Sequence, residues 1–306
     1  MGEYRVKTAI YHLHALTALH AGTGQGVGVI DLPVARERST GLPIVPGSGI
    51  KGVLREELRP DDGEDKTQWE ALFGPDSDSA ERDDARRFAG ALAIQDAQLL
   101  SLPVRSIHGV FAWLSCPFVL RRYLRDRARS SLSPAPGKLA QPADENIAIS
   151  GNSCLARDAK VYLEDLDLEA VEDMDSGPMA SLIADSVFPD DPEWRDLFIE
   201  RFAIVSDAVF DYLAETATEV RARIRLKPDT RTVAKGGLWY EENLPAETLL
   251  WGLLGCDRAR NGTQSADELL DTFRRDLETD GETRLQIGGK ATVGRGNVRW
   301  LLNMGD

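Results

Sequence analysis

The chain has 306 residues, with 36 Lys and Arg against 50 Asp and Glu, so its formal net charge is −14. With 42% hydrophobic and 28% charged residues, it has the composition of a globular protein with a sizeable core, which excludes disordered and disulfide-scaffold classes. Cys116, Cys154 and Cys256 are far apart and form no C-x-x-C motif, which argues against a structural zinc site and fits a cytoplasmic protein. The run from Ser106 to Leu120 is too short and too polar to span a bilayer, and the start MGEYRV lacks the apolar region of a signal peptide. We therefore expect no membrane partner.

The N-terminal quarter predicts a strand, a glycine-rich turn and a basic helix. Residues 5–14 alternate apolar and polar side chains, as a strand does, and glycines at 22, 24, 26 and 28 exclude regular structure after it. A helical stripe over residues 49–58 follows, with Ser48 as its expected N-cap. Lys51 and Arg55 are four residues apart and so lie on one face of that helix.

The middle of the chain combines a basic helix with an acidic insertion. We expect a strand at residues 90–97, then a helix at 118–129 whose Arg121, Arg125 and Arg129 point outward, and a loop at 130–142. Between Val161 and Trp194 there are eleven acidic residues and no Lys or Arg. We interpret about 60–195 as an insertion or lid region that contains this acidic segment.

The C-terminal third predicts a basic hairpin and a strand–loop–strand end. Residues 202–205 form a short strand, and Ser206 caps the next helix. Residues 219–226 alternate strictly, so that Arg221, Arg223 and Arg225 share one strand face. We expect this strand to open a long hairpin spanning about 219–254. A helix at 266–277 is followed by strands at 284–287 and 297–302 around the loop GGKATVGRG.

The charge distribution points to nucleic acid in spite of the acidic total. A net charge of −14 argues against a generic basic nucleic-acid binder, because a negative field repels phosphates. Basic residues are nevertheless concentrated in three segments, namely 121–129, 221–235 and 284–299. A single charge run is usually a solvated face, but three such runs beside glycine-rich chain are harder to explain by solubility alone.

Most common catalytic motifs are absent. GTGQGVG has Val27 where a dinucleotide-binding fingerprint needs glycine, and GGKATVGRG does not match a P-loop. A glycine loop can still bring backbone N–H groups close to phosphates, with Lys290 and Arg295 supplying charge, although tight turns alone would also explain it. His12 and His14 could form a zinc pair only with a third ligand that is not evident. No serine, cysteine or zinc hydrolase signature is present, and we expect no organic cofactor.

Asp31 differs from the other acids because it lies in the apolar context VIDLP and is soon followed by Arg36 and Arg38. An isolated aspartate of this kind is most often a turn or capping residue. Its functional interpretation is metal ligation or proton abstraction at an RNA 2′-OH.

Four segments taken together resemble one family. They are LTALHAGTGQG (16–26), IDLPVARERSTGLPIVPGSGIKGVLRE (30–56), GGLWYEENLP (236–245) and QIGGKATVGRGNVRW (286–300). Their order and spacing resemble the RAMP superfamily of CRISPR effector proteins, and within it the backbone subunits of type III-B (Cmr) complexes. The IDLP-x-x-RE and LWYEENLP elements distinguish this group from the related type III-A backbone subunits. The matching motifs cover roughly a quarter of the chain.

The resemblance implies an α+β fold with a modified RRM-like, ferredoxin-like core, a β-hairpin thumb and a lid insertion, all in one RAMP domain over residues 1–306. It implies Asp31 as the cleavage residue and as a metal ligand, with His20 as a second catalytic residue. The residues that it assigns to the thumb are Trp239, Tyr240 and Glu241. The residues that it and the basic patterns assign to RNA are Ser48, Lys51, Arg55, Arg36, Arg38, Arg221, Arg223, Arg225, Gly288, Gly289, Lys290, Gly294, Arg295 and Gly296. Gly49 stands where the family has a second serine.

The implied function is that of a repeated subunit in a ribonucleoprotein filament. The expected partners are guide crRNA, single-stranded target RNA, further copies of the chain, a large polymerase-like subunit and a small helical subunit. The expected reaction is target cleavage at regular intervals by in-line attack of a 2′-OH, with a divalent ion, Mg²⁺ or Mn²⁺. Base pairing would select the sequence, so that the protein needs only backbone and shape contacts.

Two alternatives stay open at this stage. The first is a guide-binding scaffold without nuclease activity, which an Asp31→Ala protein that assembles but no longer cuts would exclude. The second is a stand-alone guide-processing ribonuclease of the same superfamily, which would cut precursor RNA without partners.

Overall fold

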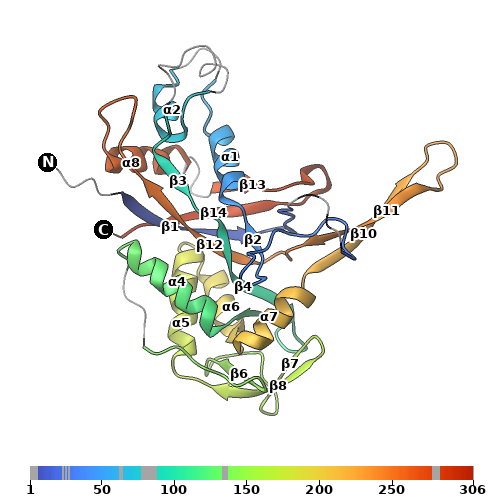
Figure 1. Cartoon of the computed structure of the whole chain (residues 1–306). Coiled ribbons are helices and arrows are strands. Elements are labelled where there is room, and N and C mark those ends of the chain that lie inside the picture. The colour runs from blue at the N-terminus through green and yellow to red at the C-terminus, as the bar shows by residue number, and fades with distance from the viewer. Residues whose placement is uncertain are drawn as a thin grey trace.

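The computed structural model describes residues 6–22, 24, 26, 28–61, 65–76, 88–132, 137–277 and 283–305. A long mixed sheet crosses the molecule (Figure 1). Its main path, in spatial order, is β13 (Thr283–Gln286), β14 (Asn297–Asn303), β1 (Lys7–Ala15), β12 (Leu249–Cys256), β4 (Ala97–Arg105), β5 (Phe111–Ser115), β9 (Phe202–Ile204), β6 (Asn146–Ile149), β8 (Leu166–Glu172) and β7 (Lys160–Leu163). Two short strands pair beside it, β2 (Ile44–Val45) with β4 and β3 (Leu92–Ile94) with β12. The predicted α+β class is confirmed.

Helices cover both faces of the sheet and enclose two hydrophobic clusters. Strand β1 shows why, since its side chains alternate: Tyr11 and Leu13 join one cluster, whereas Ile10 joins the other. One face packs against α1 (Gly47–Glu57), α2 (Thr67–Phe73) and α8 (Ala266–Leu277). The other face packs against α4 (Pro117–Arg129), α5 (Ser176–Val187), α6 (Pro192–Arg201) and α7 (Asp207–Thr216). None of the helices in the described residues is long and apolar enough to cross a membrane.

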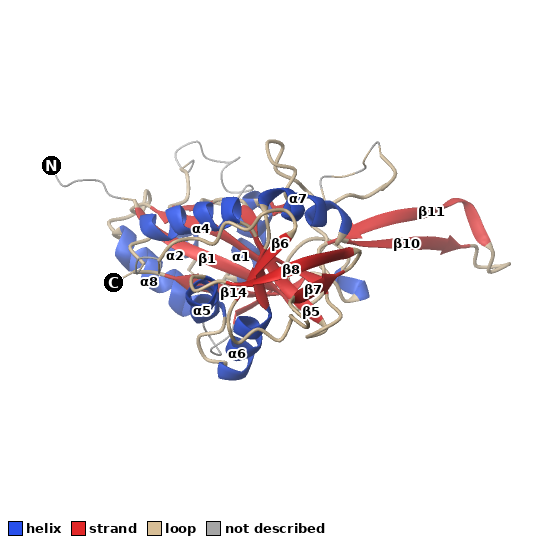
Figure 2. Cartoon of the chain, turned by 90° about the horizontal axis from the view of Figure 1, so that it is seen from below, coloured by secondary structure: helices blue, strands red, loops and turns tan. Residues whose placement is uncertain are grey.

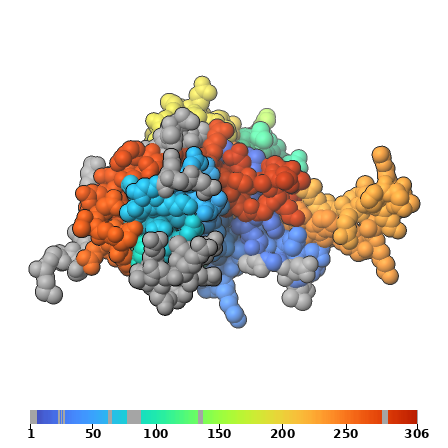
Figure 3. Space-filling model, turned by 90° about the horizontal axis from the view of Figure 1, so that it is seen from above, coloured from blue at the N-terminus to red at the C-terminus, as the bar shows by residue number. Residues whose placement is uncertain are grey.

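A two-stranded ribbon, β10 (Glu219–Leu226) and β11 (Val233–Asn243), projects far from the body of the protein (Figures 1 and 3). The hairpin therefore ends at Asn243, and its predicted extension to residue 254 is wrong. Residues 249–256 form β12, which pairs with β1 and β4 in the large sheet. The physical reason is visible in the sequence LLWGLLGC, which is apolar on both strand faces, as a strand covered on both sides must be.

Most of the other predicted elements are confirmed. Strands β1, β9, β10, β13 and β14 and helices α4 and α8 lie within two residues of their expected bounds. Ser206 caps α7 as expected, because its hydroxyl accepts the Val209 N–H at 3.2 Å. Ser48 is not a cap, however, since α1 begins at Gly47 after Pro46, and the Gly47 N–H donates to the Asp96 carboxylate at 2.7 Å.

The strand expected at residues 90–97 is wrong in extent. The chain turns at Gln95 and Asp96, so that β3 and β4 are separate strands that both pair with β12. Strand β5 was not predicted because the run from Ser106 to Leu120 lacks alternation and contains both a strand and a helix start. Strand β4 begins at Ala97, where the predicted strand was expected to end.

The acidic segment 161–194 is folded. It contains β7, β8 and α5, and the buried residues of α5 include Met179, Ile183 and Val187. Its acidic side chains lie mostly at the surface, so the segment is highly charged and still contributes apolar side chains to the hydrophobic core. The expected glycine turn includes Thr23, Gln25 and Val27, and the expected insertion includes 62–64, 77–87 and 133–136; these positions lie outside the described residues.

Candidate nucleic-acid interface

The segment around Asp31 is attached to the base of the hairpin by backbone pairing. The Leu32 N–H donates to the Tyr240 carbonyl at 3.1 Å, and the Glu242 N–H donates to the Leu32 carbonyl at 2.9 Å. The Asp31 carboxylate itself accepts the Tyr240 N–H at 2.8 Å and is exposed. These contacts hold the carboxylate in a defined position at the protein surface, where the hairpin leaves the body.

His20 contacts the same end of β11 and has a defined hydrogen-bond arrangement. Its Nδ1 contacts the Glu242 carbonyl oxygen at 2.7 Å, so Nδ1 carries the proton in the neutral ring and Nε2 is the proton acceptor. The ring is buried, with 7% exposure. A Cβ at Gly22 would lie 2.8 Å from Nε2, which explains why this neighbour is glycine.

A surface groove of about 580 Å³ runs beside His20, and it joins three segments that are distant in sequence. Its lining includes Gly22 and Gly24 from the N-terminal turn, Ser48 and Gly49 from the first turn of α1, and Gly288, Gly289 and Lys290. At the helix start the Gly47 N–H donates to Asp96 and the Gly49 N–H to the Pro46 carbonyl, so the helix contributes the Ser48 N–H and the positive end of its dipole. Lys290 adds a full charge. Such a lining is suited to an anionic backbone.

The glycine-rich loop is shaped by one close approach to His20. The Gly289 N–H donates to the His20 carbonyl at 3.1 Å, and Gly288, with φ +78°, packs so closely that a Cβ would overlap the same carbonyl oxygen. Lys290 and Gly294 adopt left-handed conformations on either side of a short 3-10 turn, Ala291–Val293. Gly296 returns the chain to β14 and donates its N–H to the Ala18 carbonyl at 3.0 Å. Backbone geometry therefore explains these glycines without any ligand.

Glu241 is the centre of a buried ion network that joins the hairpin base to this loop. Its carboxylate contacts Lys290 at 2.9 Å and Arg295 at 2.8 Å, and it accepts hydrogen bonds from Trp239 at 2.7 Å and Arg223 at 3.3 Å. Burial would raise the pKa of Glu241, but the hydrogen bonds from Lys290, Trp239 and Arg223, with the charge of Lys290, lower it to about 2. Arg295 also donates to Asn243 at 2.7 Å and is buried. Arg295 thus lies inside the protein, whereas Lys290 also lines the groove.

Glu242 forms a second clamp that the sequence analysis missed. It is buried and accepts hydrogen bonds from Arg36 at 2.6 Å, the Val34 N–H at 3.0 Å and Thr218 at 3.0 Å. The sequence did contain a signal for this pair of buried acids. Glu241 and Glu242 are consecutive in one strand, so their side chains point to opposite faces, and each face then needs cationic or N–H partners. Asp96, which holds the start of α1, gave no such signal.

The predicted RNA-binding cations differ in what they contact. Arg36 donates to the Gly41 and Ala214 carbonyls at 2.9 and 3.1 Å in addition to Glu242, whereas Arg38 is exposed. Arg55 donates to the Phe73 and Pro75 carbonyls at 3.1 and 2.9 Å and stacks on Trp69 at 4.4 Å. Lys51 donates to the Leu92 carbonyl at 2.7 Å, and burial followed by the charge of Arg55 lowers its pKa. Lys51, Arg36 and Arg55 are therefore held by the protein's own carbonyl groups.

On the hairpin, the three predicted arginines occupy one strand face as expected. Arg221 contacts Glu219, Arg223 contacts Glu241, and Arg225 is exposed. The opposite face is also exposed and is apolar, with Tyr240 at 41% and Leu238 at 53% exposure. The ribbon consequently presents one cationic and one apolar surface to whatever lies beside it.

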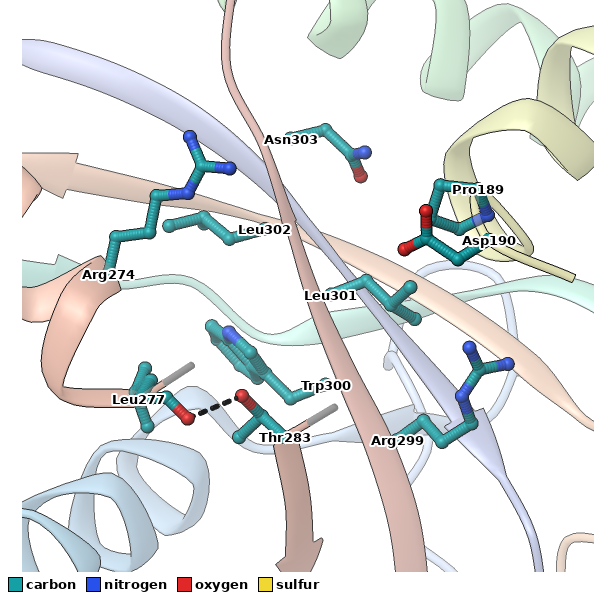
Figure 4. Close-up of a pocket in the computed structure, with 10 residues that line it drawn as sticks. All are labelled: Pro189, Asp190, Arg274, Leu277, Thr283, Arg299, Trp300, Leu301, Leu302 and Asn303. Atoms are coloured by element: carbon teal, nitrogen blue, oxygen red, sulfur yellow. Dashed lines mark hydrogen bonds between the residues drawn. The ribbon is translucent and has the colours of Figure 1, made fainter. Parts of the chain in front are cut away.

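A separate pocket of about 420 Å³ lies along β14, between Pro189 and Asp190 on one side and Arg274 on the other (Figure 4). It contains none of the predicted site residues.

No group of three His, Cys, Asp or Glu suited to a metal ion occurs among the described residues. His12 hydrogen-bonds Tyr123 and Asn303, and His14 pairs with Glu247 at 2.6 Å, so the two rings have separate partners.

A mixed sheet with helices on both faces, a glycine-rich loop before the last strand and a projecting hairpin define the class: the chain belongs to the RAMP superfamily, whose profile matches residues 12–299. Within it, the chain is a homologue of Cmr4. It is 35% identical over 298 residues to "CRISPR system Cmr endoribonuclease Cmr4" of Pyrococcus furiosus, covering 97% of this chain and 96% of that one.

Solved structures agree with this assignment. The crystal structure of oligomeric Cmr4 from Pyrococcus furiosus matches with a TM-score of 0.74 and 27% identity over 99% of this chain and 100% of that chain. A chain of the type III-B Cmr-beta complex bound to cognate target RNA, determined by cryo-electron microscopy, has the same fold, with a TM-score of 0.71 and 20% identity over 98% of each chain.

Proposed function

We propose that this chain is the endoribonuclease subunit that forms the backbone of a type III-B effector, binding guide crRNA and cutting paired target RNA. The observation that carries the proposal is the placement of Asp31. An exposed carboxylate, oriented by the Tyr240 N–H at 2.8 Å, stands where the hairpin leaves the body and beside a groove lined by Lys290 and the start of α1. The identity to the Pyrococcus furiosus endoribonuclease supports the same activity.

The groove is suited to bind the sugar–phosphate backbone of the guide RNA. Phosphates would lie against the first turn of α1 at Ser48 and Gly49 and against the loop at Gly288, Gly289 and Lys290. These contacts read no sequence, which agrees with a protein that leaves sequence selection to base pairing. Arg38, Arg221 and Arg225 are exposed and extend the positive surface, whereas Arg295 supports the loop from inside.

The hairpin offers an explanation for regular distances between cleavage sites along the target RNA. We infer that its apolar face, with Tyr240 and Leu238, meets the guide–target duplex and displaces a nucleotide beside Asp31. Copies of the chain in a filament would repeat this arrangement at regular intervals along the target. The other effector subunits, a large polymerase-like one and a small helical one, would bind the same filament.

We infer a reaction that these placements support. The 2′-OH of the displaced nucleotide attacks the adjacent phosphorus, and the bond from phosphorus to the 5′-oxygen breaks, which yields a 2′,3′-cyclic phosphate and a 5′-hydroxyl. Asp31 accepts charge or the 2′-OH proton, and Nε2 of His20 is the available proton carrier. The carboxylate could hold Mg²⁺ or Mn²⁺ together with phosphate oxygens and water, and such an ion would neutralise charge at the phosphate.

The test is target cleavage by the assembled complex with Mg²⁺ or Mn²⁺, comparing wild type, Asp31→Asn and Asp271→Asn. Asp271 is an exposed acid on α8 and controls for the lost charge. We expect Asp31→Asn to assemble, to bind target and to lose at least about 100-fold in cleavage rate, a typical effect of removing a general base. Unchanged cleavage by Asp31→Asn, or products with 5′-phosphates, would overturn the proposal.

A further inference from the structure

Helix α4 carries a stripe of exposed side chains that the groove does not explain. Phe118, Arg121, Arg125 and Arg129 are separated by three or four residues, so they lie on one face, while Val119, Leu120 and Tyr123 are buried on the other. The guanidinium groups follow one another at intervals of about 6 Å along the helix axis. This interval is comparable to the spacing of neighbouring phosphates in an extended nucleic-acid strand.

The three arginines of this stripe make few contacts within the protein, so most of their N–H groups remain available to a ligand. Arg121 donates to the neutral side chain of Gln141 at 2.6 Å, and Arg125 contacts its neighbour Asp126 at 3.0 Å while its side chain stays 55% exposed. The side chain of Arg129 is exposed and makes no hydrogen bond or ion pair with the described residues. Arg122, in contrast, pairs with Glu37 through two hydrogen bonds of 2.7 and 2.9 Å. A chain with a net charge of −14 has no need of outward arginines for solubility.

A hollow of about 320 Å³ lies at the start of the stripe. Its lining includes Phe118, which is 39% exposed, together with Asp207 and Asp211. The Arg122 guanidinium lies 5.4 Å from the centroid of the Phe118 ring. Asp207 is oriented there by the Phe118 N–H, which it accepts at 2.8 Å. An exposed aromatic ring next to carboxylate acceptors suits a nucleobase, whose face can stack and whose amino group can donate.

The stripe is continuous with the site described above. The pair between Arg122 and Glu37 joins α4 to the loop that follows Asp31, and Arg36 joins the same loop to α7 through the Ala214 carbonyl. In Figure 2, α4 and α7 follow one another along one edge of the molecule, and α7 is the nearer of the two to the hairpin. A strand that leaves the hairpin base along this side reaches the hollow first and the arginines afterwards.

We propose that α4 is a second RNA-binding element, with a nucleobase stacked on Phe118 and consecutive phosphates bound by Arg121, Arg125 and Arg129. This inference rests on the proposed function, because it extends the RNA path beyond the groove. The ligand is a single-stranded RNA segment, supplied by either the guide or the target.

The test measures RNA affinity of the assembled complex across a salt series, separately for guide and for target RNA. The variant is the triple replacement Arg121→Gln, Arg125→Gln and Arg129→Gln. Its control, Arg105→Gln, Arg157→Gln and Arg260→Gln, removes the same charge from exposed positions elsewhere. We expect the stripe variant to reduce the slope of log affinity against log salt by about 2 for one of the two RNAs, since three phosphate contacts are lost. The control should leave the slope unchanged.

Phe118→Ala separates stacking from charge. It should weaken binding of the same RNA by about tenfold without changing the salt slope. The inference is overturned if the stripe variant binds both RNAs as the control does, or if it keeps RNA affinity and instead loses a protein subunit, which would identify an acidic protein surface as the partner. Lys290→Ala tests the proposed function independently. If this variant binds guide RNA as tightly as wild type, the groove does not bind the RNA backbone, whatever the stripe variant shows.

Discussion

The base and the outer part of the hairpin belong to the same two strands but are stabilised in opposite ways. At the base, Glu241 and Glu242 are buried, and each gathers several donors from the body of the protein. Further out, Ile224 and Leu238 face each other across the ribbon and are each 53% exposed. An isolated two-stranded hairpin is marginally stable in water. The base therefore fixes Asp31 at the surface of the folded body, whereas the outer ribbon has no such support.

The largest expected effect comes from breaking the base with Glu241→Gln. Removing the carboxylate leaves Lys290 and Arg295 without their common counter-charge in a buried site, which we expect to cost about 3–5 kcal/mol. Urea unfolding at neutral pH measures this difference. Glu219→Gln is the matched control, because Glu219 pairs with exposed Arg221 and should cost less than about 1 kcal/mol. Equal effects of the two variants would contradict the contrast between base and ribbon.

The same carboxylate predicts a pH dependence. Its pKa is lowered to about 2 in the folded protein from an ordinary 4.5, so the unfolded chain binds the proton first as the pH falls. The stabilisation, about 3 kcal/mol, is complete above pH 4.5 and is lost between pH 4.5 and 2. The stability difference between wild type and Glu241→Gln should therefore shrink over that range in urea titrations. A difference that stays constant from pH 6 to pH 2.5 would show that the network does not bind Glu241 as an anion.

A smaller effect is expected where the glycine loop meets His20. Gly288→Ala forces a side chain onto a residue with φ +78° and into the His20 carbonyl, and we expect a loss of about 2 kcal/mol. Gly289→Ala is the control, because the nearest atom to its Cβ would be 4.0 Å away. Thermal unfolding compares the two. If both glycines tolerate alanine equally, the close approach does not determine the loop conformation.

The sequence was sufficient to predict local elements and the resemblance, but not the identities of their contacts. Alternation revealed β10 and its three arginines, and helical periodicity gave α4 and α8, because these patterns depend on local geometry. The ion network could not be predicted, since Glu241 precedes Lys290 and Arg295 by about fifty residues and meets them only through the pairing of β14, β1 and β12. The hairpin end was misplaced for the same reason: only the sheet shows that residues 249–256 leave the ribbon.

The candidate site shows the same division. Asp31 was singled out by its apolar surroundings and assigned to cleavage by the resemblance, and the structure adds the Tyr240 N–H that orients it. Lys51 and Arg55 were predicted to share one helix face and were assigned to RNA by the resemblance, yet both donate to backbone carbonyls of the protein. A charge pattern cannot distinguish a cation that binds a ligand from one that hydrogen-bonds the protein's own backbone. Every residue has a carbonyl group, so the sequence does not show which carbonyls are the acceptors.

The smallest expected effect on stability comes from the outer ribbon. Replacing the facing pair, Ile224→Thr and Leu238→Thr, removes an exposed apolar contact, and cross-strand pairs contribute less than about 1 kcal/mol. Thermal unfolding should change little, whereas the assembled complex should lose regular spacing of its cleavage products if this face meets the duplex. Ile107→Thr replaces an isoleucine that is 73% exposed outside the hairpin, and it should change neither measurement. A fall in stability as large as that of Glu241→Gln would show that the apolar face packs against the body of the protein, and the contrast between base and ribbon would then be lost.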